Sequence, residues 1–88
     1  MTATEETYVI WSHEHGAWWR PGGHGYTPRL SEAGHYTRDG ALLICIRAVP
    51  GTSSMLGALP ELPVRLADVR TVIAAYDAEY GERPEPWR

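Results

Sequence analysis

The chain has 88 residues and a formal net charge of −3, from eleven acidic and eight basic residues. A chain of this length forms one domain at most and buries only about 60–65% of the surface that its unfolded form exposes. Every basic residue is arginine, and the arginines do not cluster. This pattern disfavours a nucleic-acid-binding protein, because such proteins use basic patches to neutralise phosphates.

The sequence favours a cytoplasmic protein without a membrane partner. Its single cysteine, Cys45, cannot form an internal disulfide, which is typical of a reducing compartment. Residues 1–7 are polar and acidic and carry neither the basic nor the apolar region of a signal peptide. No apolar run approaches the ~20 residues that span a bilayer.

The first part of the chain predicts a β-hairpin. Residues 7–12 are rich in β-branched and aromatic side chains, which indicates a strand. A turn at residues 13–16 leads to a second strand at residues 17–20. Glycines in residues 21–25 end that strand, and residues 26–27 form a brief extended piece.

A short strand and a helix are expected next. Residues 30–34 read as a loop or a single turn, followed by a strand at residues 35–36. Thr37 is a good helix N-cap, and the helix is expected from Arg38 to about Ala48. The residues expected to face the core from this helix are Leu42, Ile46 and Cys45.

The clearest helix lies near the end of the chain. Residues 50–60 read as irregular, and Pro63 restricts residues 62–64 to an edge strand because it lacks an amide proton. An apolar stripe with the period of a helix then follows, with Gly81 as its C-terminal stop. Ile73 and Tyr76 lie at its centre and are expected to be buried. The stripe consists of Val69, Val72, Ile73, Tyr76 and Tyr80.

These elements predict an α+β fold in a single domain over residues 1–88, with flexible tails at 1–6 and 82–88. The fold is a small antiparallel sheet, a hairpin plus one or two short strands, with two helices packed on one face. Adjacent Trp18 and Trp19 point to opposite faces of the sheet. One tryptophan therefore lies under the helices, and the other forms a contact patch or is covered by Trp87 of the tail.

No catalytic or metal constellation is apparent, and we expect neither an enzyme nor a cofactor. His13 and His15 form one pair in a turn, with His24 and Cys45 elsewhere, whereas a structural zinc site has two paired clusters. Glu14 and the two turn histidines lack a nucleophile to activate. Cys45 stands among aliphatic residues, so it is expected to be a small core residue.

The aromatic residues allow two interpretations. Trp11, Trp18, Trp19 and Tyr26, near Arg20 and Arg29, could stack on the bases of a single nucleic-acid strand. They could also be the core of a domain that has no phenylalanine. We favour the core for most of them and a binding surface for one or two, because tryptophan is enriched at binding hot spots.

Four segments carry a family resemblance: YVIWS at 8–12, AWWRP at 17–21, GYT at 25–27 and EAGHYTR at 32–38. Over roughly residues 7–70 the sequence resembles a group of small proteins that phages and prophages of GC-rich bacteria encode. The group has no activity to transfer. Gly40 departs from it, because such sequences tend to carry Glu there, which completes a capping box.

The resemblance implies a small phage protein that binds a host machine, and anti-CRISPR proteins share its short, mildly acidic and non-enzymatic character. We therefore expect an inhibitor in the host cytoplasm that blocks target-DNA binding by a CRISPR surveillance complex (Cascade) through steric and electrostatic occlusion. Its partner is a host protein or ribonucleoprotein, not free nucleic acid, and the inhibitor is a monomer or homodimer. The residues expected to bind this partner are Glu14, Trp18, Trp19, Asp77 and Glu79.

Two alternatives remain open. The first is a phage accessory or scaffold protein that acts through homo-oligomer or host-protein contacts. The second is a module that binds single-stranded nucleic acid.

Overall fold

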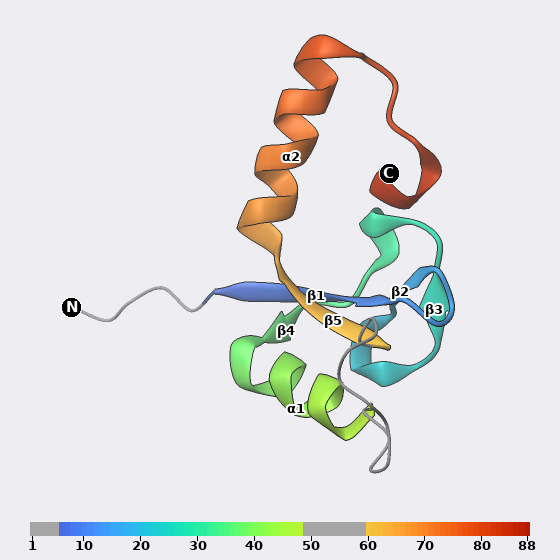
Figure 1. Cartoon of the computed structure of the whole chain (residues 1–88), viewed down its shortest axis with the longest axis vertical. Helices are drawn as coiled ribbons and strands as arrows, with labels where there is room; N and C mark the ends of the chain where they lie inside the picture. The colour runs from blue at the N-terminus through green and yellow to red at the C-terminus, as the bar shows by residue number, and fades with distance from the viewer. Residues whose placement is uncertain (1–5, 49–59) are drawn as a thin grey trace, which may run out of the picture.

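The fold is built around strand β1, Thr7–Ser12, which has the bounds that its β-branched and aromatic residues predict. The computed structural model describes residues 6–48 and 60–88. Within these residues β1 pairs with three other strands, and Figure 1 shows it passing through the middle of the molecule.

The described strands form one antiparallel sheet in the order β3 (Tyr26–Thr27), β2 (Ala17–Trp19), β1 and β4 (Tyr36–Thr37), and β5 (Glu61–Arg65) also pairs with β1. Strand β2, Ala17–Trp19, completes the predicted hairpin, and β3, Tyr26–Thr27, extends the sheet beside it. Strand β4, Tyr36–Thr37, begins one residue later than predicted and pairs with the N-terminal end of β1. The α+β fold class is confirmed.

Strand β5, Glu61–Arg65, lies along β1 over five residue pairs. Among the described strands it pairs with β1 alone. Pro63 lies opposite Ile10 and has no amide proton to donate to a further strand. The prediction of an edge strand at residues 62–64 is confirmed.

The helices lie on opposite faces of the sheet, so the prediction that both pack on one face is wrong. Helix α1, Arg38–Ala48, places Ala41 and Cys45 against Tyr8 and Ile10 of β1. In Figure 1 α1 lies below β1, whereas the second helix, α2 (Leu66–Glu79), rises above it. Both faces of β1 are therefore covered.

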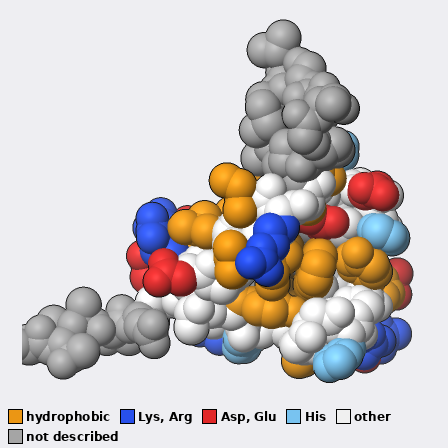
Figure 2. All heavy atoms as spheres, turned by 90° about the horizontal axis from the view of Figure 1, so that it is seen from below, with side chains coloured by type: hydrophobic (Ala, Val, Ile, Leu, Met, Phe, Trp, Pro, Cys, Tyr) orange, Lys and Arg blue, Asp and Glu red, His pale blue; other side chains and the backbone are white. Residues whose placement is uncertain are grey.

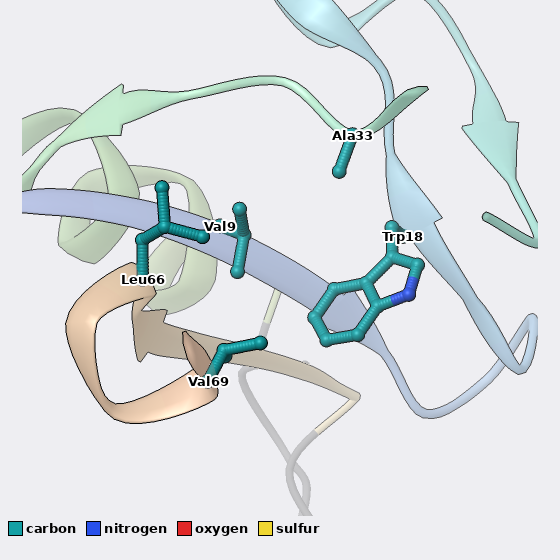
Figure 3. Close-up of a cluster of buried hydrophobic side chains, with 5 residues drawn as sticks. All are labelled: Val9, Trp18, Ala33, Leu66 and Val69. Atoms are coloured by element: carbon teal, nitrogen blue, oxygen red, sulfur yellow. The ribbon is translucent and has the colours of Figure 1, made fainter. Parts of the chain in front are cut away.

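Helix α2, Leu66–Glu79, covers the face that the other residues of β1 present. Figure 3 shows Leu66 and Val69 of this helix beside Val9 and Trp18 of the sheet. Alternate side chains of a strand point to opposite faces, so Val9 belongs to this cluster while its neighbours on β1 belong to the other.

The predicted orientation of helix α1 is wrong for two of the three residues expected to face the core. Cys45 is buried as expected, but Leu42 is exposed and Ile46 keeps 71% of its surface accessible. The smaller side chains Ala41 and Cys45 face the sheet instead. Almost every residue from 41 to 46 is apolar, so hydrophobicity alone does not select the inner side of this helix.

Helix α2 packs on the sheet through its first half. Leu66 and Val69 are buried, whereas Ile73 and Tyr76 are half-buried, which corrects the expectation that both lie in the core. Figure 1 shows that α2 extends away from the sheet after its first turns. Val72 and Tyr80 of the predicted stripe are exposed.

The remaining predictions for the backbone divide between described and undescribed residues. Residues 1–5 of the predicted N-terminal tail and most of the irregular segment 50–60 lie outside the described residues. A 3-10 helix at Leu30–Glu32 confirms the predicted loop or turn at 30–34. Within residues 6–48 and 60–88, no helix has the length and apolar character that crossing a membrane requires.

Candidate binding groove beside helix α2

Two adjoining cavities form an apolar groove between the sheet, α2 and the C-terminal segment. We call it the tryptophan groove, since Trp87 borders both cavities. One cavity has a volume of about 330 Å³, and the other has about 240 Å³. The first is lined by Trp11, Trp18, Leu62, Val64, Val69, Pro86 and Trp87. The second is lined by Val72, Ile73, Tyr76, Arg83, Pro84 and Trp87.

The sheet supplies the floor of the groove through a cross-strand pair. Trp11 of β1 lies directly opposite Trp18 of β2. Their rings meet edge to face, with centroids 4.9 Å apart and an interplanar angle of 71°. Aromatic pairs favour this geometry because the positive edge of one ring meets the negative face of the other. Leu62 and Val64 of β5 extend this surface on the same face.

The C-terminal segment, expected as a flexible tail, returns to the sheet and forms a wall of the groove. A 3-10 helix at Glu85–Trp87 places the ring of Trp87 edge-on to Trp18, with centroids 6.1 Å apart. The indole Nε1–H of Trp18 donates a hydrogen bond to the carbonyl oxygen of Pro86 at 2.6 Å. The segment therefore folds back onto the sheet, as the sequence-based alternative for Trp87 has it, but Trp87 packs on the face that α2 also covers and not on a face without a helix.

The chemistry of the groove suits an apolar or aromatic group. Its lining is aliphatic or aromatic except for Arg83, whose Nε lies 3.2 Å from Asp77 Oδ1. Binding sites are commonly concave and apolar, with a few polar groups that fix orientation. The groove can bind a partner's side chain, and the Arg83–Asp77 pair can orient it.

The five residues predicted to bind a partner do not share one surface. Trp18 is only 3% exposed and lies in the floor of the groove, while Asp77 does not line the groove and is joined to it only through its ion pair with Arg83. Glu79 is exposed on the last turn of α2, and Glu14 is exposed in the turn between β1 and β2. Figure 1 shows that this turn lies well away from the C-terminal end of α2.

Trp19 lies on the opposite face, where it is half-buried and has a structural role. Its Nε1–H donates to Glu61 Oε2 at 2.9 Å, and Ser12 Oγ donates to Oε1 of the same carboxylate at 3.3 Å. Glu61 is buried, and a buried carboxylate is costly unless it accepts hydrogen bonds. Trp19 also packs edge-on against Tyr26, with centroids 5.5 Å apart.

Ser12 and His15 resemble a nucleophile beside a base, since Ser12 Oγ lies 3.0 Å from His15 Nδ1. Ser12 is fully buried, however, and its hydroxyl donates to Glu61 and accepts the backbone N–H of His15. This arrangement shapes the turn that Gly16 completes with a φ of +61°. No face of the hydroxyl is open to a substrate.

The ring of His15 stacks on Tyr26, with centroids 3.9 Å apart and an interplanar angle of 17°. Burial, and then the charges of Glu61 and Glu14, raise the pKa of the Tyr26 phenol. The phenol therefore stays neutral at physiological pH, and the stacked pair is an exposed feature of the hairpin end.

The candidate metal ligands are not brought together. Across residues 6–48 and 60–88, no three His, Cys, Asp or Glu side chains are grouped as a metal would require. His13 and His24 are exposed, whereas Cys45 is buried beneath the sheet. Burial, and then the charge of Glu61, raise the pKa of the Cys45 thiol to about 11. The prediction that Cys45 is a core residue is confirmed, and its thiol is protonated at neutral pH.

The aromatic residues do not form one stacking surface for nucleic-acid bases. Trp11 and Trp18 lie on the α2 face, and Trp19 and Tyr26 pair on the other. Arg20 Nη2 lies 3.6 Å from Glu32 Oε1, and Arg29 Nε lies 3.8 Å from Glu85 Oε2. These ion pairs reduce the positive charge that the two arginines offer to phosphates.

A second apolar surface covers the outer side of α1. Figure 2 views the molecule from that side and shows hydrophobic side chains gathered across it. Leu42, Leu43 and Ile46 are 39%, 48% and 71% exposed. These side chains are exposed, whereas those of the tryptophan groove line two cavities.

Sequence reasoning missed most of the groove. The hypothesis drawn from the sequence centred on Trp18 and Trp19, and it did not treat Trp11, Leu62 and Val64 as parts of one binding site. Two features of the sequence could have indicated the groove. One is the apolar run from Tyr8 to Trp11, and the other is Trp87, which lies directly after Pro86 near the C-terminal end.

Comparisons of the chain with protein-family models, with curated proteins and with solved structures found no match.

Proposed function

We propose that this protein is a small inhibitor that acts by binding a host protein complex through the tryptophan groove. The observation that carries the proposal is the groove itself, in which three tryptophans and the side chains of α2 and β5 line about 330 Å³ and about 240 Å³ of apolar space. Tryptophan is enriched at the energetic centre of protein interfaces, where a side chain enters a dry pocket.

The charge around the groove supports an electropositive partner. Residues 77–88 contain four carboxylates and two arginines, and in the described part of the chain no ion pair reaches Glu79. Complementary charge accelerates encounter with a basic surface and selects against acidic ones. Together with the resemblance to small phage proteins, this supports a CRISPR surveillance complex as the partner, whose basic DNA channel the inhibitor occupies.

The test measures target-DNA binding by a purified surveillance complex in the presence of added protein. We expect the protein to abolish that binding while it leaves bare DNA unbound. Leu62→Arg places a charge in the floor of the groove. We expect it to weaken inhibition at least about tenfold, because burying an unpaired charge costs more than 1.4 kcal/mol, which is about a factor of ten.

The matched control is Leu43→Arg, which makes the same change at an exposed leucine on the outer side of α1. We expect this variant to inhibit like the parent, with both variants folded by circular dichroism. Equal loss of inhibition in the two variants contradicts the groove as the binding site. Tight binding to bare DNA without an effect on the complex contradicts the function and supports the nucleic-acid alternative.

A further inference from the structure

The C-terminal segment occupies the tryptophan groove in the manner of a bound ligand. Residues 82–88 contribute Trp87 to the groove and the Pro86 carbonyl oxygen to the indole N–H of Trp18. The segment is also joined to the body of the domain by Ser31 N–H, which donates to the Arg88 carbonyl oxygen at 3.2 Å. Figure 1 shows the chain leaving the end of α2 and returning toward the sheet.

The segment has the chemistry of a preorganised peptide. Pro84 is extended, with φ −62° and ψ 158°, and a turn of 3-10 helix follows that contains Pro86. Prolines restrict the unbound conformations, so less entropy is lost on binding. The turn presents one aromatic ring and one carbonyl oxygen, and Trp18 contacts both.

The ion pairs that hold the segment are weak: Arg83 and Asp77 are 35% and 41% exposed, and the second pair is more exposed still. The ion pair between Arg29 and Glu85 spans 3.8 Å, and both side chains are more than half exposed. Exposed pairs of this kind contribute about 0–1 kcal/mol. Gly81, with φ +87°, joins the segment to α2 and is a conformationally permissive hinge.

The segment also leaves space beside it. Trp87 stands between cavities of about 330 Å³ and about 240 Å³ without filling either one. A ligand that had the same aromatic anchor and further apolar side chains would make the contacts of the segment and additional ones.

We propose that the groove is a recognition site for a proline-flanked aromatic residue in an extended segment of a partner protein, and that residues 82–88 are a resident ligand which this segment displaces. The inference rests on the proposed function: the partner binds the same groove, on Trp11, Trp18 and the side chains of α2 and β5, and its aromatic residue takes the place of Trp87. The tethered segment competes at a high effective concentration, so it sets a threshold that a foreign ligand must exceed.

The test uses a synthetic peptide with the sequence of residues 81–88, GERPEPWR, added to the full chain labelled with nitrogen-15. The readout is the indole N–H resonance of Trp18. In the Trp87→Ala chain, where the resident anchor is absent, we expect the peptide to shift this resonance saturably. In the parent chain we expect the apparent affinity to be at least about tenfold weaker, because the tethered segment competes at millimolar effective concentration.

A peptide in which alanine replaces tryptophan is the ligand control, and it should leave the resonance unchanged. Trp87→Leu retains an apolar cover over Trp18 and serves as a second variant if Trp87→Ala does not fold. Its affinity for the peptide should lie between those of Trp87→Ala and the parent.

The inference is overturned if folded Trp87→Ala and Trp87→Leu chains both leave the Trp18 resonance unmoved by the peptide. A concentration-dependent dimer of the parent that Trp87→Ala abolishes also overturns it, in favour of segment exchange between two copies. These outcomes are independent of the surveillance complex. Inhibition of the complex without peptide binding refutes only this inference, and peptide binding without inhibition refutes only the proposed partner.

Discussion

Val69 and Val72 lie one turn apart on α2, and replacing each of them by alanine tests how far the helix packs on the sheet. Val69 is 2% exposed, whereas Val72 is 53% exposed. We expect Val69→Ala to lower the free energy of unfolding by about 1.5–3 kcal/mol through lost burial and a residual cavity. Val72→Ala should change it by no more than about 0.5 kcal/mol. Denaturant midpoints measure both, and equal costs would contradict the packing of α2.

Cys45 provides a test of burial on the opposite face. Its folded pKa of about 11 exceeds the ordinary value of 9.0. The unfolded thiol therefore loses its proton before the folded one, and the stability that depends on this proton is complete below pH 9 and lost as pH rises through 11. We expect the free energy of unfolding to fall between pH 9 and pH 11 by about 2 kcal/mol more in the parent than in Cys45→Ala.

Chemical unfolding at each pH measures this difference. Thiol alkylation gives a separate check, because the native chain should react far more slowly than the chain in denaturant. Rapid alkylation of the native protein would show that Cys45 is accessible.

At the scale of the element, the start of α1 depends on one side chain. The backbone N–H of Gly40 donates to Thr37 Oγ1 at 3.1 Å, as the predicted N-cap requires. Thr37→Ala removes the acceptor and should reduce stability by about 1 kcal/mol. Thr37→Ser keeps the hydroxyl and is the control, with stability close to that of the parent. Thermal or urea unfolding distinguishes the two, and an equal loss in both would exclude the cap as its cause.

The sequence predicted the helices and strands better than it predicted which face of the sheet each helix covers. Turn glycines, Thr37 and Pro63 act locally, so the hairpin, the start of α1 and the edge strand could be inferred from neighbouring residues. The side on which each helix lies depends on contacts between distant residues. Tyr8 to Trp11 form an unbroken apolar run, which is typical of a strand buried on both faces. That run indicates one helix on each side.

The same limit applies to the candidate site. Trp18 and Asp77 were singled out from the sequence; Trp18 lines the groove, and Asp77 forms an ion pair with Arg83, which also lines it. Its other parts come from β1, β5 and the C-terminal segment, and only the folded chain brings these together. Sequence reasoning could identify residues with the chemistry of an interface, but it could not show that Trp19 is engaged by Glu61 instead.

At the scale of the whole molecule, stability should not depend on a metal. The turn histidines are exposed and Cys45 is buried on the α1 side, so they do not converge. We expect exhaustive chelation to leave the melting curve unchanged, since removal of a structural metal unfolds the domain that it holds. Elemental analysis of the purified protein is the control. A stoichiometric metal together with a lowered melting temperature would contradict this expectation.

The position of β1 also has a consequence for biosynthesis. Ser12 at the end of β1 pairs with Glu61, 49 positions later, and β5 follows the other strands that the structure describes. During translation the hairpin, β4 and α1 emerge while one long edge of β1 still awaits its partner. Such late, non-local pairing slows folding, and an open strand edge is a template for other chains. Nascent chains interrupted before residue 61 are therefore the form of this protein most prone to aggregate, and rapid completion of synthesis protects it.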